Sequence, residues 1–90
     1  MLTPDLTSQA ERFISGLQTK EAAQIVKKIQ YLCSEPFPTQ SVKLEGFDFY
    51  RAKCGDYRIV YAVEGELLVV KLVESRHDDE VYKILKKLYG

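Results

Sequence analysis

The sequence predicts an α+β fold, in which a helical hairpin packs on a small antiparallel sheet of three to four strands and a further helix follows at the C-terminus. Apolar residues recur every three or four positions through residues 8–32, which is the period of amphipathic helices. From Phe47 the period falls to two, as in strands, and after Glu74 a second helical pattern begins. These changes of period predict the three parts of the fold.

The first helix is expected over about residues 8–17, because Thr7 and Ser8 offer N-cap hydroxyls ahead of Glu11 as the capping-box partner. A second helix is expected to be capped by Thr19 and to end before Pro36, since the residue preceding a proline disfavours helical backbone angles. The two helices should form an antiparallel hairpin, with their apolar faces toward the sheet.

Three strands are expected over about residues 47–54, 57–63 and 67–74, after a loop at 34–43. Short turns at Gly55 and Asp56, and at Glu64 and Gly65, connect them as a meander. One face of this sheet collects apolar side chains suited to packing on the helical hairpin: Tyr50, Ala52, Tyr57, Ile59, Tyr61, Val63, Leu68, Val70 and Leu72.

The opposite face of the predicted sheet carries cations. A two-residue first turn places Lys53 opposite Arg58 and Arg51 opposite Val60, and a two-residue second turn places Arg58 opposite Lys71. Like charges that face each other across strands are destabilising. The simplest reason to keep them is an anion between them, such as a nucleic-acid phosphate.

The last helix is expected to begin among the acids that follow His77, because acidic side chains suit a first helical turn. Its apolar positions are Val81, Tyr82, Ile84, Leu85 and Leu88.

Length and composition favour one soluble domain spanning residues 1–90, with 46% hydrophobic and 29% charged residues. The 13 basic and 13 acidic residues cancel, so a nucleic-acid site must be local, and a larger partner is expected to present the strand. The chain has no apolar run of roughly 20 residues and no secretion signal, so we expect a cytoplasmic protein that does not bind membranes.

Cysteine and histidine usage indicates neither a disulfide nor a metal site. Cys33 and Cys54 lie in different predicted elements without a Cys-x-x-Cys pair, which favours buried free thiols. With His77 as its single histidine, the chain is expected to hold no metal, and no cofactor is expected.

Cleavage of RNA by its own 2′-hydroxyl requires a base, an acid and cations that stabilise the developing charge. Candidates for the proton steps are Tyr82, His77 and the lysines. Structural alternatives stay open: the cations of the sheet can be solvated side chains, Tyr82 a half-buried helix residue and His77 a loop residue. Phe49 shares the cationic face, where it can stack a base or pack under the last helix.

Two segments of the sequence resemble a known family. The run YRAKCGDYRIVY at residues 50–61, together with ESRHDDEVY at 74–82, is similar to the RelE branch of the RelE/ParE toxins, and the likeness covers nearly the whole chain. It implies a RelE-like toxin of a type II toxin–antitoxin module that enters the ribosomal A site, cuts mRNA there and is silenced by a cognate antitoxin. The implied partners are that antitoxin, with which the toxin can form a hetero-oligomer, and the ribosome with its mRNA.

The resemblance also implies roles for residues. Lys53 or Tyr82 would take the 2′-hydroxyl proton, Arg58 would hold the phosphorane charge, and a later arginine would assist the leaving oxygen. The implied catalytic residues are Arg51, Lys53, Arg58, Arg76 and Tyr82. The expected RNA-binding residues are Phe49 and Lys71, from their places on the cationic face, and His77.

The sequence departs from the family at several points. Arg51 occupies a position where the family commonly has lysine. Arginine keeps the positive charge, but it does not deprotonate in proteins and so cannot act as a proton donor. Arg76 lies in an acidic loop, so His77 can be the matching residue instead. Pro4 interrupts residues 1–6, so the family's first strand is expected to be short or missing. The ParE branch shares the fold but acts on DNA gyrase, and a third alternative is an inactive relative that only binds antitoxin.

Overall fold

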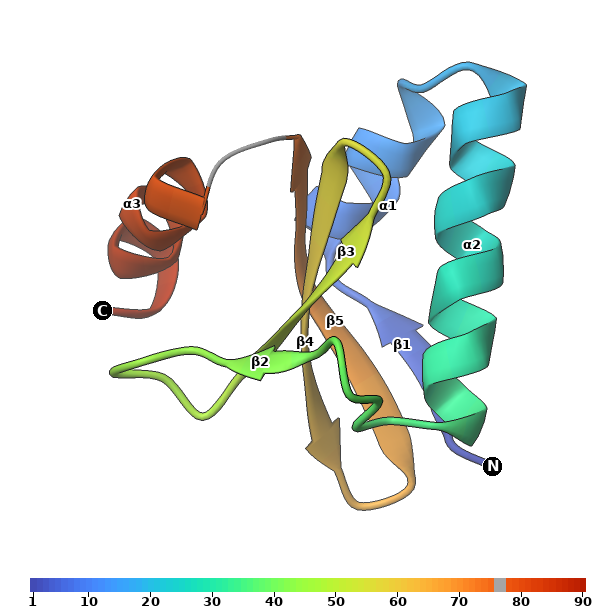
Figure 1. Ribbon diagram of the computed structural model, residues 1–90. Helices are drawn as coiled ribbons and strands as arrows, with labels where there is room; N and C mark the ends of the chain where they lie inside the picture. Colours follow the sequence, from blue (N-terminus) through green and yellow to red (C-terminus); the bar gives the residue numbers. More distant parts are fainter. Residues whose placement is uncertain (76–77) are drawn as a thin grey trace.

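The structure is a computed structural model that describes residues 1–75 and 78–90 (Figure 1). These residues form a five-stranded sheet in the order β1-β5-β4-β3-β2, in which β1 is parallel to β5 and the other pairs are antiparallel. The α+β class is confirmed, with one strand more than the upper end of the expected range. The elements in chain order are β1 (Thr3–Leu6), α1 (Ser8–Ser15), α2 (Thr19–Ser34), β2 (Val42–Lys43), β3 (Tyr50–Cys54), β4 (Tyr57–Glu64), β5 (Leu67–Ser75) and α3 (Asp78–Tyr89).

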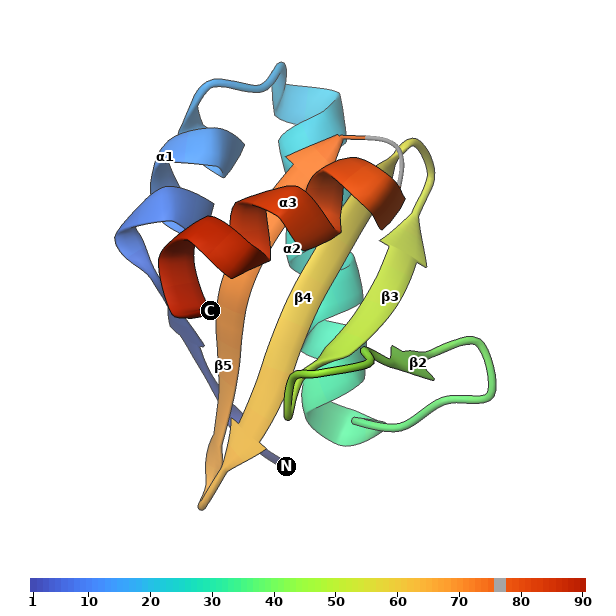
Figure 2. The same ribbon diagram turned by 90° about the vertical axis from the view of Figure 1, so that its left-hand side faces the viewer.

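The sheet lies between two helical layers. Helices α1 and α2 cover one face and α3 covers part of the other (Figure 1), and in Figure 2 α3 crosses in front of β5 and β4 and leaves β3 uncovered. No helix in the described part of the chain is both long and apolar enough to cross a membrane. Each face of the sheet therefore has a core of its own, and the site described below lies on the face that α3 only partly covers.

The first strand is present and short, with four residues, which is one of the two outcomes expected from Pro4. The Thr3 N–H donates to the Glu66 carbonyl at 2.9 Å, so strand alternation places the nitrogen of Pro4 on the outer edge. A proline costs no ladder hydrogen bond there. Beyond β1, the side-chain amide of Gln9 takes the place of a strand: its Nε2 donates to the Val73 carbonyl at 2.9 Å and its Oε1 accepts the Val73 N–H at 3.0 Å.

Of the two predicted helix N-caps, Thr7 is confirmed and Thr19 is wrong. Thr7 is the N-cap of α1, and its Oγ1 accepts the Ala10 N–H at 3.3 Å, as its position before the first helical turn predicts. Thr19 is not a cap. It is the first residue of α2, and the N-cap position belongs to Gln18, whose side chain makes no capping hydrogen bond.

The turn between β3 and β4 has the predicted register. Cys54 pairs with Tyr57, Lys53 with Arg58 and Arg51 with Val60, around a glycine with a positive φ of 60° at Gly55. The predicted start of this strand at Phe47 was wrong, because residues 47–49 form a loop and β3 begins at Tyr50.

The predicted register between β4 and β5 was wrong. The turn falls one residue later than expected, at Gly65 and Glu66, with Glu64 opposite Leu67. A β-bulge then adds Lys71 to β5, because Tyr61 pairs with Val70 and the next pair joins Val60 to Leu72. Arg58 consequently faces Glu74 instead of Lys71.

The bulge also divides the apolar residues of β5 between two cores. Leu68, Val70 and Val73 join the core under α1 and α2, whereas Leu72 joins the core under α3. The predicted division into one core face and one charged face was therefore wrong, since a one-residue shift moves every later side chain to the other face. The core under α3 consists of Leu44, Val60, Leu72, Val81 and Leu85, with Phe47, Phe49, Tyr82 and Ile84 packed against it.

Tyr61 gives the first testable prediction. Its side chain is fully buried, and its hydroxyl donates to the Pro36 carbonyl at 2.6 Å. Tyr61→Phe should lower the free energy of unfolding by about 1 kcal/mol at neutral pH, because one hydrogen bond is lost. Burial raises the pKa of Tyr61. The native state therefore disfavours the phenolate, and the wild type should lose stability as the pH rises above about 10.

Urea unfolding at neutral and alkaline pH tests this, with Tyr31→Phe as a control in a side chain that is 46% exposed. The gap in unfolding free energy between wild type and Tyr61→Phe should narrow in alkali. A gap that widens there would show that Tyr61 is not the titrating group.

Candidate functional site

The cations of β3 and β4 lie on the face of the sheet that carries α3. Val60 packs against Val81 and Leu85 of α3, so its neighbour by alternation, Arg58, lies on the same face. Opposed residues share a face, which adds Arg51 and Lys53. The chain thus places three cations together on two adjacent strands, at the part of the sheet that α3 leaves open.

Lys53 and Arg58 form the centre of this cluster. They are directly opposed across β3 and β4, where Cα atoms are about 4.5–5.5 Å apart, and Lys53 is exposed. The third residue of this row is Glu74 of β5, opposite Arg58. The predicted row of three cations therefore consists of two cations, Lys53 and Arg58, and one acid, Glu74.

The Arg58 guanidinium is held against its own turn. Its Nη1 donates to the Tyr57 carbonyl at 3.0 Å and to the Gly55 carbonyl at 3.3 Å. The side chain is half-buried. These contacts fix the position of the planar guanidinium, which is a group suited to binding oxyanions.

Arg51 lies deeper than its neighbours. It is 8% exposed, and like Arg58 it is held by contacts within the protein. An arginine stays charged in such surroundings. Arg51 therefore acts as a fixed positive charge behind Lys53, two residues along the same strand and on the same face.

Tyr82 lies on the first turns of α3, half-buried against the core. Its hydroxyl oxygen accepts the Glu45 N–H at 3.0 Å, and its ring centroid lies 6.4 Å from that of Phe47. The same hydroxyl can also donate a hydrogen bond to a second partner. Tyr82 thus joins α3 to the loop between β2 and β3.

Phe49 and Lys71 lie together under the C-terminal end of α3. The Phe49 ring meets Tyr89 edge to face at 5.2 Å and stacks on Phe47 at 5.6 Å, so of its two expected roles the structure shows packing under the helix. The Lys71 ammonium lies 2.8 Å from a carboxylate oxygen of Glu64, 5.3 Å from the Phe49 ring centroid and 5.7 Å from that of Tyr89. Lys71 is not in the row formed by Lys53 and Arg58.

Arg76 and His77 lie outside the described residues. The segment that carries them joins β5 to α3, and β5 ends at Ser75 beside the row that holds Arg58. Sequence reasoning did not single out Glu74, Glu45 and Phe47, which the structure places next to the predicted residues. For Glu74, a signal would have been the position of the β-bulge, which the alternation of β5 does not reveal.

The arrangement can bind a phosphate and stabilise negative charge on it. Lys53 is exposed, the half-buried guanidinium of Arg58 lies opposite it, and Arg51 adds a fixed charge. Among the described residues, no group of three or more His, Cys, Asp or Glu side chains is placed to hold a metal ion.

Comparison with known proteins agrees with this architecture. The sequence model of the family described as the ParE toxin of type II toxin-antitoxin system, parDE, matches residues 3–82. A search of curated proteins finds no match. A mutant E. coli RelE toxin in the free state is 25% identical, with a TM-score of 0.78, and the match covers 99% of this chain and 98% of that chain.

Two complexes extend the comparison. The archaeal RelE–RelB complex from Pyrococcus horikoshii contains a chain that is 25% identical, with a TM-score of 0.75, and the match covers 86% of this chain and 97% of that chain. In the YoeB–YefM complex from Staphylococcus aureus, the matching chain is 14% identical and shows the fold alone, with a TM-score of 0.67 and coverage of 86% and 99%.

The fold and these matches define a toxin of the RelE/ParE superfamily, as the resemblance of its strands and last helix predicts. The chain belongs to the ParE toxin family of type II toxin-antitoxin systems, since the family match covers well over half of its length.

Proposed function

We propose that this protein is a toxin that cleaves mRNA on the ribosome, as an endonuclease acting through the ribose 2′-hydroxyl. The observation that carries the proposal is the opposed pair of Lys53 and Arg58 on the open part of the sheet, backed by Arg51. Opposed cations cost stability unless an anion lies between them. A scissile phosphate is the anion that uses both charges, because charge builds up on its oxygens during cleavage.

In the proposed reaction the 2′-oxygen bonds to the adjacent phosphorus and the bond from phosphorus to the 5′-oxygen breaks. The proton of the 2′-hydroxyl passes to a base, Lys53 or Tyr82, and the 5′-oxygen takes a proton from water as it leaves. Arg58 stabilises the phosphorane oxygens, and Arg76 assists the leaving oxygen. The products are a 2′,3′-cyclic phosphate and a 5′-hydroxyl.

Tyr82→Phe tests the proton role without disturbing the ring. We expect cleavage on ribosomes to slow by about 100-fold, the lower end of the usual contribution of a general acid or base. Stability should fall by about 0.5–1 kcal/mol, since the Glu45 N–H loses its acceptor in an exposed position. Single-turnover cleavage and urea unfolding measure the two effects. Tyr89→Phe is the matched control, because Tyr89 lies on the same helix and its hydroxyl also makes one hydrogen bond to the backbone, as the donor to the Lys71 carbonyl.

Cleavage by Tyr82→Phe at the wild-type rate would leave Tyr82 with only the structural role of holding Glu45 and Phe47.

The proposed partners are the cognate antitoxin, the ribosome and its mRNA, all in the cytoplasm. The relatives RelE from P. horikoshii and E. coli were solved as complexes with RelB, which supports an antitoxin for this chain. The net charge of zero supports presentation of the RNA by the ribosome, because the chain lacks the bulk charge needed to collect RNA alone.

A second candidate function is inhibition of DNA gyrase, and the family match favours it, since that family is described as the ParE toxin. Induced expression in a bacterium separates the candidates. The nuclease proposal predicts growth arrest with mRNA ends inside A-site codons on ribosomes. Arrest with DNA-damage signalling and no such ends would establish the gyrase alternative, and no arrest would indicate an inactive relative that binds antitoxin.

A further inference from the structure

Glu74 is an acidic side chain in a row that otherwise consists of cations. It lies on β5 opposite Arg58, and Arg58 lies opposite Lys53 on β3, so the three residues follow one another across three adjacent strands. Leu72, two residues earlier in β5, packs against α3, so alternation places Glu74 on the face that carries α3. The proposed reaction gives Glu74 no role.

The backbone holds Glu74 in this position. The β-bulge at Lys71 shifts the register of β5 and so brings Glu74 into the row. On the other edge of β5, the Gln9 side chain bonds to both backbone groups of the preceding residue, Val73, at 2.9 and 3.0 Å. Glu74 is half-buried, and its Oε1 accepts the Ser75 N–H at 3.1 Å. The acid is therefore a fixed part of the row.

Glu74 affects where a chain of phosphates can lie on the sheet. RNA is charged at every nucleotide, so a phosphate held by Lys53 and Arg58 has further phosphates on both sides. Adjacent strands are about 4.8 Å apart, which places the backbone of Glu74 one strand spacing from Arg58 and two from Lys53. Repulsion weakens as charges separate, and at physiological salt it is only partly screened within about 8 Å. Phosphates over β5 are therefore repelled more strongly than phosphates over β3.

We propose that Glu74 is a specificity-determining residue, which weakens the binding of RNA to the cationic cluster and excludes the RNA backbone from β5. The RNA strand then lies over β3, which α3 leaves uncovered (Figure 2). Free RNA binds too weakly to be captured, whereas RNA that the ribosome presents at a high local concentration is bound. The proposal rests on the proposed function for RNA as the ligand.

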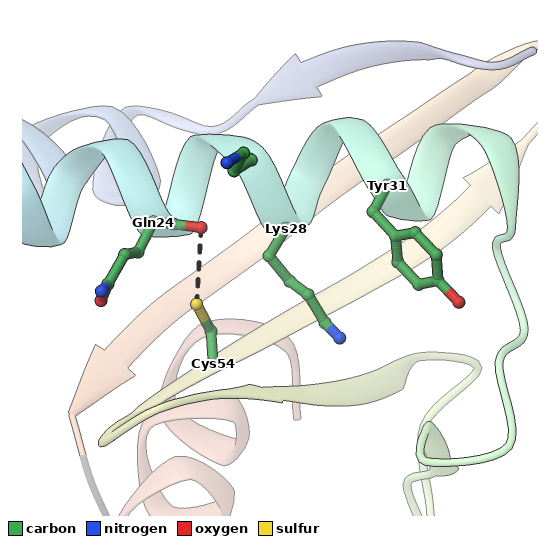
Figure 3. A pocket seen from close by; sticks show the side chains of 5 residues that line it. Gln24, Lys28, Tyr31 and Cys54 are labelled. Atoms are coloured by element: carbon green, nitrogen blue, oxygen red, sulfur yellow. Dashed lines mark hydrogen bonds between the residues drawn. The ribbon is translucent and has the colours of Figure 1, made fainter.

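The other side of the sheet offers a second basic surface for comparison. A groove of about 380 Å³ lies there between α2 and the end of β3, and it is lined by Gln24, Lys27, Lys28, Tyr31 and Cys54 (Figure 3). The Lys28 ammonium lies over the Tyr31 ring, 5.1 Å from its centroid. Lys28 is therefore a control for cations that the proposed RNA path does not reach.

Binding of an RNA that cannot be cleaved tests the proposal. The probe is a fluorescently labelled oligonucleotide with 2′-O-methyl groups throughout, which lacks the attacking hydroxyl. Glu74→Lys should bind it at least about 10-fold more tightly than the wild type at low salt, because a repulsive charge becomes attractive. The plot of log affinity against log salt should be steeper by about 0.7, the value for one further neutralised phosphate in a single strand.

Glu74→Gln separates the charge from the shape of the side chain. The amide oxygen of glutamine still accepts the Ser75 N–H, so this variant removes only the negative charge. Its affinity for the probe should rise by about 3-fold. Glu11→Lys and Glu11→Gln are the matched controls, because they change the net charge equally at an exposed position of α1, on the other face of the sheet. Equal gains in affinity at the two positions, or none at either, would overturn the proposal.

Cleavage on ribosomes gives a second readout. Glu74→Gln should lower the KM for ribosomes by about 3-fold and leave the rate at saturation within about 2-fold of the wild type, because Glu74 acts on binding and not on the chemical step. A large loss of rate at saturation would show that Glu74 takes part in the reaction, which contradicts its role as a restraint. Lys28→Gln should bind the probe like the wild type, and weaker binding would place the RNA over the groove and contradict the path over β3.

This inference and the nuclease proposal fail in different ways. A wild type that leaves mRNA intact on ribosomes would reject the nuclease, whereas tighter probe binding by Glu74→Lys than by Glu11→Lys would still support the role of Glu74. Cleavage by the wild type, together with equal probe binding by these two variants, would keep the nuclease and remove the role of Glu74.

Discussion

Arg58→Ala is expected to lower the rate of mRNA cleavage on ribosomes by about 100- to 1,000-fold. A preorganised donor that stabilises an oxyanion contributes this much in other enzymes, and Arg58 is the donor opposite Lys53 at the centre of the cluster. The measurement is single-turnover cleavage at saturating ribosome concentration. Arg58→Lys should recover part of the rate, because it restores the charge without the bidentate geometry.

The control for this prediction is Arg12→Ala, which removes an exposed arginine from α1 on the other face of the sheet. Its cleavage rate should match the wild type. Arg58 also bonds to the Gly55 and Tyr57 carbonyls, so unfolding by urea must show that the variant remains folded. A folded Arg58→Ala protein that cleaves at full rate would remove Arg58 from the reaction.

Leu85→Ala is expected to cost about 2–5 kcal/mol of unfolding free energy, a large fraction of the total for a domain of this size. Leu85 is fully buried in the core under α3, and its removal leaves a cavity between the helix and Val60 and Leu72. Because α3 also carries Tyr82, weaker docking of this helix on the sheet should also lower the rate of mRNA cleavage.

Leu88→Ala is the matched control, because the same side chain on the same helix is 54% exposed. Its cost should stay within about 0.5 kcal/mol, as for other surface substitutions. Urea unfolding compares the two variants directly. Similar costs for both would contradict the docking of α3 on the sheet.

The fold was predictable wherever local rules decide it. Gly55 requires a turn with positive φ, and the alternation on both sides then sets the register that places Lys53 opposite Arg58. The second hairpin has equally clear alternation, yet its pairing depends on a bulge at Lys71 that turn and alternation rules do not specify. Sequence reasoning therefore predicted Lys71 beside Arg58, where the structure places Glu74.

The residues of the candidate site were predictable where the first hairpin alone places them. Arg51, Lys53 and Arg58 follow from the first hairpin alone, and the structure brings them together. The contacts of Tyr82 and Phe49 depend on how α3 crosses the sheet, which a helical period does not specify. A short β1 was one of two expected outcomes, and the sequence did not decide between them because tolerance of Pro4 depends on which backbone edge faces its neighbour.

The most direct test of the central claim is cleavage of a defined mRNA on purified ribosomes by the wild-type protein. The account predicts cleavage inside the A-site codon, with a 2′,3′-cyclic phosphate on one product and a 5′-hydroxyl on the other. A 2′-deoxy substitution at the nucleotide that would attack should abolish it. An intact message, or cleavage that persists without that 2′-hydroxyl, would contradict the proposed reaction.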